Sequence, residues 1–452
     1  MSALPQKNGL IQLDITGMTS EGSGIGRAEE MAVFVPATAV GDRILCRIVK
    51  VEKRFAYGRV EELITPSPDR LPTADCPVAA PCGGCTFRHV TYEAELRYKW
   101  QRVADALQRI GGIDITPRPI VSGASDRYRN KAQYPMGRGE EGLIFGFYAP
   151  RSHRLVPCRD CLLQPAEFKD ILNAIDGWAK KAGVTVYDET ARTGLLRHVY
   201  IRKAQATGQI MVCLVCTGGR IPMAGELTEK LKGIPGVCSV VVNLNRRDTN
   251  VVLGEEEFPL LGEPAITDRL GGLEFSLSPR SFYQVNHDMA EKLYALAAEA
   301  AGLTGNETLL DLYCGTGTIG LTMARAAKQL IGVEVVAPAV EDARRNAARN
   351  GIENARFICA DAGEAAKQLA AEGIRPDAVI LDPPRKGCDP AVIRTVAEMA
   401  PARVVYVSCD PATLARDLKL FRELGYETKT VTPVDMFPRT AHVETVVRLS
   451  RQ

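Results

Sequence analysis

The C-terminal part of the chain alternates between strand-like and helix-like stretches, and this order constrains the fold most. Five apolar β-like runs follow a predicted helix over 289–301, namely 308–313, 330–335, 356–360, 378–381 and 404–407. Strands joined by helices pair in parallel, and the helices cover both faces of the sheet. The pattern therefore predicts an α/β domain over 280–452 with a doubly wound, Rossmann-like sheet. Ligands of such a sheet bind at the carboxyl ends of its strands.

The N-terminal segment has a different pattern. Residues 8–65 contain short alternating runs of apolar and polar residues, which predict a small, OB-like β-barrel. The glycines of 21–27 predict a tight, mobile loop. A proline-rich stretch at 65–72 ends this segment.

The length of 452 residues predicts more than one domain. We expect three, which are a β-barrel over 1–66, a mixed α/β central domain over 67–279 and the parallel-sheet domain over 280–452. A helix is predicted over about 91–110 and is expected to pack on the third domain.

The total charge gives no sign of a polyanionic partner, because 56 Lys and Arg face 54 Asp and Glu. Two local patches of basic residues do indicate such a partner. Residues 43–59 hold six basic residues and one acid, with Phe55 and Tyr57 interleaved, and 97–131 hold eight basic residues and three acids. Such patches favour RNA binding, and a solvated strand face is the alternative for the first. The basic residues of the second are Arg97, Lys99, Arg102, Arg109, Arg118, Arg127, Arg129 and Lys131.

No run approaches the roughly 18 apolar residues of a membrane span, and the first residues lack a signal-peptide pattern. We therefore expect a cytoplasmic protein. In that compartment an odd count of 13 cysteines favours metal ligation, catalysis and buried thiols over disulfides.

A glycine-rich turn at 314–320 joins a predicted strand to a helix, an arrangement that brings backbone N–H groups close to a ligand. Glu334 ends the next strand and is suited to binding a ribose diol, while Asp361 follows the third strand within reach of an adenine. No Lys-Ser or Lys-Thr pair follows the glycines, so a phosphate-binding loop is not expected. The pattern indicates S-adenosylmethionine, with a merely solvated Glu334 as the alternative.

Three residues at the ends of later strands suggest the chemistry. Cys409 precedes a predicted helix, whose start lowers the pKa of a thiol, and a thiolate that adds to C6 of a pyrimidine activates C5 for methylation. Glu444 is the leading candidate for the base that then removes the C5 proton, with His442 as the alternative. Cys314, Cys359 and Cys388 are rival thiols; we expect Cys359 to be buried in the core, and Cys388 is the serious rival.

A separate cysteine cluster is predicted to bind metal. Cys76, Cys82 and Cys85 lie close in sequence, and either Cys158 or Cys161 is expected to be the fourth ligand. Spacing alone leaves zinc and an iron–sulfur cluster open.

Several motifs together resemble the 5-methyluridine RNA methyltransferases. They are DLYCGTGTIGL at 311–321, SFYQVN at 281–286, LDPPRKG at 381–387, YVSCDPATLARDL at 406–418 and FPRTAHVE at 437–444. The first 65 residues, with GMTSEGSGIGR at 17–27, resemble a TRAM domain, an RNA-binding module of this family.

The resemblance implies Cys409 as the nucleophile and Glu444 as the base. It also implies five residues at or near the cofactor, which are Gln284, Tyr313, Glu334, Asp361 and Asp382, the last also near the reacting uracil. It further implies a 4Fe-4S cluster held by Cys76, Cys82, Cys85 and Cys161.

The function expected from this resemblance is methyl transfer from S-adenosylmethionine to uridine C5 of 23S ribosomal RNA. A transfer RNA substrate is the runner-up. A non-catalytic RNA-binding iron–sulfur protein is the alternative from another class. We expect a monomer without an obligate protein partner.

Overall fold

The first five strands close into a barrel. The computed structural model describes residues 5–73, 75–140, 142–248 and 251–452. The barrel order is β1-β2-β3-β5-β4, and it closes because β1 pairs with both β2 and β4. Its strands are β1 (Leu10–Met18), β2 (Gly24–Ala28), β3 (Met31–Val35), β4 (Arg43–Val51) and β5 (Phe55–Thr65). Alternate apolar side chains, among them Leu13, Val33 and Ile44, fill the interior.

Strand β2 takes the place of much of the mobile loop predicted at 21–27. A Cβ on Gly24 would lie 2.7 Å from Cγ2 of Ile15, and it would also collide with the side chain of Thr38. Gly24 therefore permits close packing inside a narrow barrel. The prediction of a mobile loop was wrong for Gly24–Ala28.

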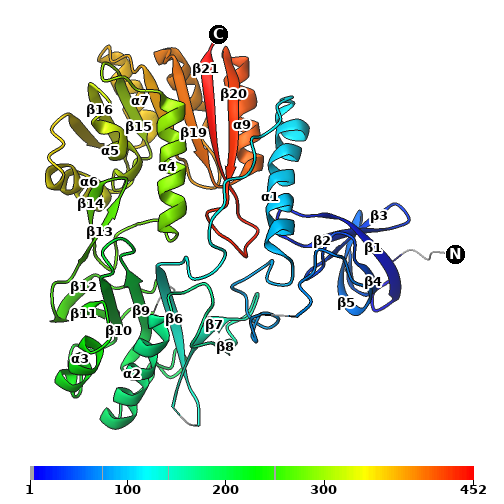
Figure 1. The fold of residues 1–452 in the computed structure, drawn as a ribbon, viewed down its shortest axis with the longest axis vertical. Coiled ribbons are helices and arrows are strands. Elements are labelled where there is room, and N and C mark those ends of the chain that lie inside the picture. Colours follow the sequence, from blue (N-terminus) through cyan, green and yellow to red (C-terminus); the bar gives the residue numbers. More distant parts are fainter. Residues whose placement is uncertain (1–4, 74, 141, 249–250) are drawn as a thin grey trace.

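The helix expected over 91–110 is present as α1 (Tyr92–Ala106), followed by one π-helical turn, η1 (Leu107–Gly111). The side chain of Thr91 caps its start by accepting a hydrogen bond from Ala94 N. Val103 and Leu107 pack into the core of the C-terminal sheet. In Figure 1, α1 lies between the barrel and that sheet.

The central residues form a second sheet, in the order β12-β11-β10-β9-β6-β7-β8. Helices α2 (Glu167–Ala182) and α3 (Ala224–Lys232) pack on one face, while the other face joins the core around the hairpin β13–β14 and α4 (Figure 1). The strands are β6 (Lys131–Arg138), β7 (Leu143–Tyr148), β8 (Leu155–Pro157), β9 (Leu196–Lys203), β10 (Ile210–Cys216), β11 (Val237–Leu244), β12 (Glu256–Leu261), β13 (Ile266–Leu270) and β14 (Leu273–Leu277).

The C-terminal sheet has the order β17-β16-β15-β18-β19-β21-β20. The first five strands in this order are parallel, and β21 and β20 are antiparallel to their neighbours. They are β15 (Thr308–Leu312), β16 (Gln329–Glu334), β17 (Ala355–Cys359), β18 (Ala378–Leu381), β19 (Arg403–Ser408), β20 (Tyr426–Val434) and β21 (Glu444–Arg451).

Helices cover both faces of this sheet. Alternate residues of β15 enter different cores, with Leu309 on one face and Leu310 on the other, so its apolar run is nearly continuous. The first face is covered by α4 (His287–Ala301), α5 (Thr318–Ala324) and α6 (Ala337–Arg349). The second is covered by α7 (Ala362–Ala371), α8 (Pro390–Met399), α9 (Pro411–Glu423) and α1. No helix among the described residues combines the length and apolarity that a bilayer crossing requires.

Candidate active site

Most of the predicted site residues meet at one edge of the C-terminal sheet. The parallel strands β15, β16, β18 and β19 all end there, and the antiparallel strand β21 begins there. Ser408 on β19 pairs with Thr445 on β21. Cys409 and Glu444 are the next residues at this edge, so they are neighbours. Asp382 follows the end of β18, the strand beside β19.

Three carboxyl groups at this edge have raised pKa values. Burial raises the pKa of Glu444 to about 8, and the charge of Asp382 adds to the shift. Burial also raises the pKa of Asp382 to about 7 and that of Asp311 to about 8. Asp311 accepts a hydrogen bond from Gly320 N at Oδ2, whereas its buried Oδ1 has no partner. A cation bound among these groups would stabilise their charged forms.

Asp311 was not among the predicted site residues. The sequence did contain a sign of it, because a single acid interrupts the apolar run Thr308–Leu312 directly before the glycine-rich turn. A buried acid inside a strand needs a partner or a ligand.

Cys409 is half-buried at the start of α9. The sequence predicted that the helix start lowers the pKa of its thiol. Instead, burial and the charges of Glu444 and Asp382 raise it to about 11, with Arg385 acting in the opposite direction. Burial and two nearby carboxylates raise the pKa of the thiol by more than the helix start lowers it. The thiol therefore needs a further positive charge or a base to ionise.

The rival thiols have other surroundings. Cys388 is buried next to Tyr406 and Tyr313, and burial raises its pKa to about 12. Cys314 is also buried. Cys359, which the sequence placed in the core, is exposed. The prediction was wrong because Cys359 ends β17, the edge strand of the sheet.

The predicted cofactor site lies around the glycine-rich turn at 314–320. The carboxylate of Glu334 accepts hydrogen bonds from Gly315 N (3.1 Å) and Val336 N (2.9 Å). Asp361 caps α7 by accepting a hydrogen bond from Gly363 N (2.8 Å). Tyr313 has a left-handed backbone, with a φ of 69°, and the pKa of its hydroxyl is raised by burial, by the neighbouring Cys388 and by the charge of Asp361. Tyr313 and Asp361 therefore lie close together where the glycine-rich turn begins.

Gln284 lies in the segment between β14 and α4. Its backbone carbonyl accepts a hydrogen bond from Asn130 Nδ2, and Nδ2 of the nearby Asn286 donates to Met436 O, which ties this segment to the residues before β21. Nearby in the same segment, Phe282 is 65% exposed. An exposed ring at this place is a feature that the sequence analysis missed.

The five candidate cysteines of the predicted metal site are brought near one another. Burial raises the pKa of Cys85 to about 12, and the charges of Cys161, Cys82 and Cys76 contribute. A hydrogen bond from Cys158 lowers the pKa of Cys161 to about 7. Among the described residues, no three His, Cys, Asp or Glu side chains are arranged to hold a single metal ion.

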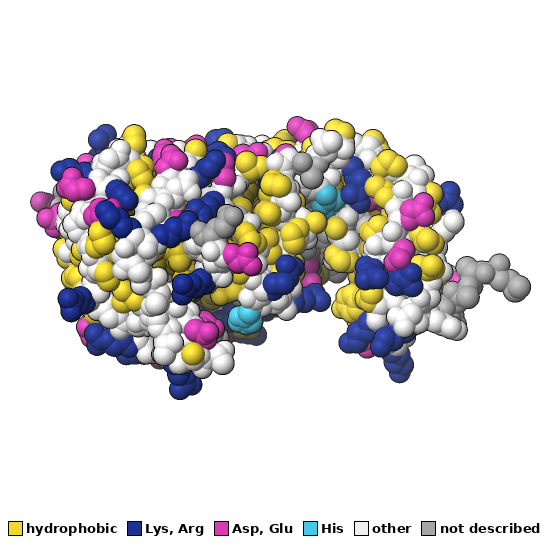
Figure 2. All heavy atoms as spheres, turned by 90° about the horizontal axis from the view of Figure 1, so that it is seen from below, with side chains coloured by type: hydrophobic (Ala, Val, Ile, Leu, Met, Phe, Trp, Pro, Cys, Tyr) yellow, Lys and Arg dark blue, Asp and Glu magenta, His cyan; other side chains and the backbone are white. Residues whose placement is uncertain are grey.

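Basic residues of the two predicted RNA-binding patches differ in exposure. Lys99 is fully buried against Glu95 and Asp435, so its inclusion among RNA-facing residues was wrong. On the barrel, Phe34, Phe55 and Tyr57 form a cluster with ring centroids 5.5–5.9 Å apart. Seen from below, the surface is indented between the barrel on the right and the rest of the molecule, with Lys and Arg on both sides (Figure 2).

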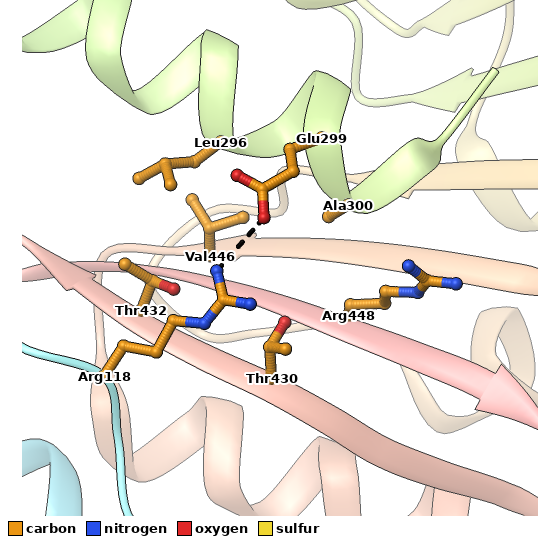
Figure 3. Close-up of a pocket in the computed structure, with 8 residues that line it drawn as sticks. All are labelled: Arg118, Leu296, Glu299, Ala300, Thr430, Thr432, Val446 and Arg448. Atoms are coloured by element: carbon orange, nitrogen blue, oxygen red, sulfur yellow. Dashed lines mark hydrogen bonds and ion pairs between the residues drawn. The ribbon is translucent and has the colours of Figure 1, made fainter.

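A small cavity of about 60 Å³ lies between α4 and the strands β20 and β21. Arg118 and Glu299 form an ion pair across it, and Arg448 lines its other side (Figure 3). None of the predicted catalytic, cofactor or metal-binding residues lines this cavity.

Comparison with known proteins places these observations in a family. Residues 265–452 match the family model described as tRNA (uracil-5-)-methyltransferase, and residues 10–60 match the TRAM domain. An uncharacterised RNA methyltransferase of Halalkalibacterium halodurans is 46% identical over 447 residues, covering 98% of this chain and 97% of the relative. One from Clostridium tetani is 42% identical with the same coverage.

A solved structure is similar over nearly the whole chain. It is the tRNA (uracil-54, C5)-methyltransferase of Pyrococcus abyssi in complex with S-adenosyl-L-homocysteine. Its TM-score is 0.77 at 26% identity, and the match covers 97% of this chain and 100% of that one.

Proposed function

The chain belongs to the S-adenosylmethionine-dependent RNA methyltransferases of the tRNA (uracil-5-)-methyltransferase type, and from this premise we propose that it methylates C5 of a uridine in 23S ribosomal RNA. The observation that carries the chemistry is the meeting of Cys409, Asp382 and Glu444 at one sheet edge. A thiol that attacks and a carboxylate that removes a proton are the groups that a covalent C5 methylation requires.

The proposed reaction begins at Cys409. Its thiolate forms a bond to C6 of the uracil, which turns C5 into an enolate carbon. S-adenosylmethionine, when bound, supplies the methyl group that C5 takes up as the bond from methyl to sulfur breaks. Glu444 then removes the proton from C5, and the electron pair of that C–H bond expels Cys409 and restores the C5–C6 double bond.

The cofactor is proposed to bind along the glycine-rich turn. Both oxygens of Glu334 keep lone pairs beyond their two backbone hydrogen bonds, which suits a ribose diol. Asp361, Tyr313 and Gln284 would contact the rest of the cofactor. Asp382 and Asp311 would face the sulfonium cation, whose charge offsets the cost of two buried carboxylates.

The RNA is proposed to bind across the barrel and the sheet edge. A half-buried thiol at the sheet edge cannot reach C6 of a stacked base, so the uridine must be flipped out of its stack. The aromatic cluster of the barrel and the basic residues around it suit unpaired bases and phosphates. The Pyrococcus enzyme is named for a uracil of transfer RNA, so transfer RNA is the second candidate substrate.

We also propose that Cys76, Cys82, Cys85 and Cys161 hold a 4Fe-4S cluster. An all-thiolate donor set fits such a cluster. A single zinc ion needs its ligands to converge on one point, whereas a cluster offers a separate iron to each thiolate. Cys161 is favoured over Cys158 because the family resemblance assigns the fourth ligand to the cysteine directly before the aliphatic pair Leu162–Leu163.

The experiment that tests the chemistry is adduct trapping. In Glu444→Gln, addition and methylation proceed but the C5 proton stays, so a covalent protein–RNA adduct accumulates. Cys409→Ala should give neither adduct nor product, whereas Cys388→Ala should retain both adduct chemistry and turnover. Free turnover of Glu444→Gln without an adduct would shift the base role to His442 or to water, and activity of Cys409→Ala would refute the covalent mechanism.

A further inference from the structure

One arginine joins the two segments that carry the proposed nucleophile and base. Arg102 extends from α1, and only 20% of its side chain is exposed. Its Nη1 donates a hydrogen bond to Ala441 O at 2.9 Å, and its Nη2 lies 3.1 Å from Asp410 Oδ2. A planar guanidinium donates in two fixed directions at once, which an ammonium group does not.

The contact with Asp410 fixes the turn that follows Cys409. Asp410 caps α9, since its Oδ1 accepts hydrogen bonds from Ala412 N and Thr413 N at 3.0 Å each. Its Oδ2 makes the contact with Arg102. Both carboxylate oxygens therefore have partners, and the residue next to the thiol is held from two sides.

The contact with Ala441 fixes the loop that leads to Glu444. Residues 435–443 connect β20 to β21 without regular structure, and four side chains of α1 hydrogen-bond to them, namely Tyr92, Glu95, Lys99 and Arg102. Lys99 donates to Phe437 O, and Glu95 accepts from Arg439 N. The contact of Arg102 with Ala441 is the one closest in sequence to Glu444, three residues away.

We propose that Arg102 is a positioning residue that sets the geometry between the thiol of Cys409 and the carboxylate of Glu444. The proposal rests on the proposed function, because it assigns these two groups to the reaction. Contact with an RNA phosphate is the competing role. The two protein acceptors already used by Arg102 favour the positioning role.

The attachment of α1 does not depend on Arg102. Val103 and Leu107 pack into the same core as Leu414 and Leu418 of α9. At the far end of α9, Arg422 donates a hydrogen bond to Gly112 O, at the end of η1. Arg422→Ala is therefore the control, because it removes an arginine–carbonyl hydrogen bond between α9 and the end of η1, far along α9 from Cys409.

The test compares the full-length variants Arg102→Ala, Arg102→Lys and Arg422→Ala. We expect kcat of Arg102→Ala to fall by about 100-fold, the scale of a roughly 1 Å misplacement of reacting groups. The KM for RNA should stay within about twofold, and the melting temperature should match that of Arg422→Ala. Arg102→Lys should recover only part of kcat. A loss in KM instead of kcat would show an RNA contact, and an equal loss in Arg422→Ala would show a merely structural role.

A double-mutant cycle tests the route through Asp410. Asp410→Asn keeps a helix-capping side chain but removes the charge that Arg102 pairs with. If Arg102 acts through this residue, the double variant should lose less activity than the product of the two single losses. Independent, fully multiplicative losses would contradict that route.

The rate of Cys409 alkylation by iodoacetamide separates this proposal from the proposed function. It is measured by mass spectrometry of the Cys409 peptide, without RNA or cofactor. We expect the rate to change at least threefold in Arg102→Ala and to be unchanged in Arg422→Ala. A wild-type protein that methylates no RNA would refute the function, whereas unchanged alkylation and unchanged kcat in Arg102→Ala would refute the positioning role.

Discussion

Replacing Lys99 with methionine should destabilise the C-terminal domain strongly. The side chains of Lys99, Glu95 and Asp435 are all fully buried, and the ammonium lies 2.6 Å from one carboxylate and 2.7 Å from the other. Methionine keeps much of the volume but leaves the buried Asp435 without its cation and Glu95 with only the more distant Arg439, at 3.9 Å. Removing one partner from a buried ion pair costs about 3–5 kcal/mol of the free energy of unfolding.

The loss of unfolding free energy in Lys99→Met should depend on pH. Burial raises the pKa of Glu95 to about 7, even though the charge of Lys99 lowers it. Between the unfolded value of 4.5 and this pKa, the folded chain keeps a proton that the unfolded chain has lost, so stability falls as pH rises. Without Lys99 the pKa rises further, and each unit adds about 1.4 kcal/mol to the loss above the new pKa.

Urea denaturation at pH 5.5 and pH 8 measures both effects, with the fluorescence of Trp100 as a reporter on the same helix. The control is Arg97→Ala, which removes a 60% exposed partner of Asp69 and should cost less than about 1 kcal/mol. We expect a larger loss for Lys99→Met at pH 8 than at pH 5.5. A loss below about 1 kcal/mol, or an equal loss at both pH values, would refute this reasoning.

Three further outcomes follow from the same geometry. Gly320→Ala should raise the Kd for S-adenosylmethionine at least tenfold in calorimetry, because its Cβ would lie 2.6 Å from Asp311 Oδ2; an unchanged Kd would contradict the role of Asp311. Binding of S-adenosylmethionine at pH 7 should release protons, since its cation lowers the raised pKa values of Asp382, Asp311 and Glu444. Calorimetry in two buffers should show this release and a smaller one for the uncharged S-adenosylhomocysteine, and equal release would speak against a sulfonium among these groups. Anaerobically purified Cys161→Ser should lose the iron and the absorbance near 400 nm that Cys158→Ser retains, and the opposite result would exchange the two ligands.

The sequence predicted the main architecture well, because it depends on local patterns. Alternating strands and helices predicted the α/β sheet, and short alternating runs predicted the barrel; the structure contains both. Strand β2 was missed because glycine is ambiguous in sequence. At Gly24 it serves close packing with Ile15 and Thr38 rather than chain flexibility.

The errors at individual side chains have a different cause, which is contact between distant segments. The burial of Lys99 depends on Asp435, which follows it by 336 residues in the sequence. The raised pKa of Cys409 depends on burial and then on the charges of Glu444 and Asp382, which only the folded sheet brings together. Arg102 shows the same limit, since its two acceptors follow it by 308 and 339 residues. Only the Glu95–Lys99 pair, four residues apart on one helix, could have been suspected from sequence.

The most direct test of the central claim is nucleoside analysis after methyl transfer. Anaerobically purified protein is given labelled S-adenosylmethionine with transcribed 23S ribosomal RNA or, separately, with transfer RNA. We predict that the label appears as 5-methyluridine in the ribosomal RNA and not in the transfer RNA. Label in another nucleoside, or no label in either RNA from protein that binds the cofactor, would contradict the proposed reaction.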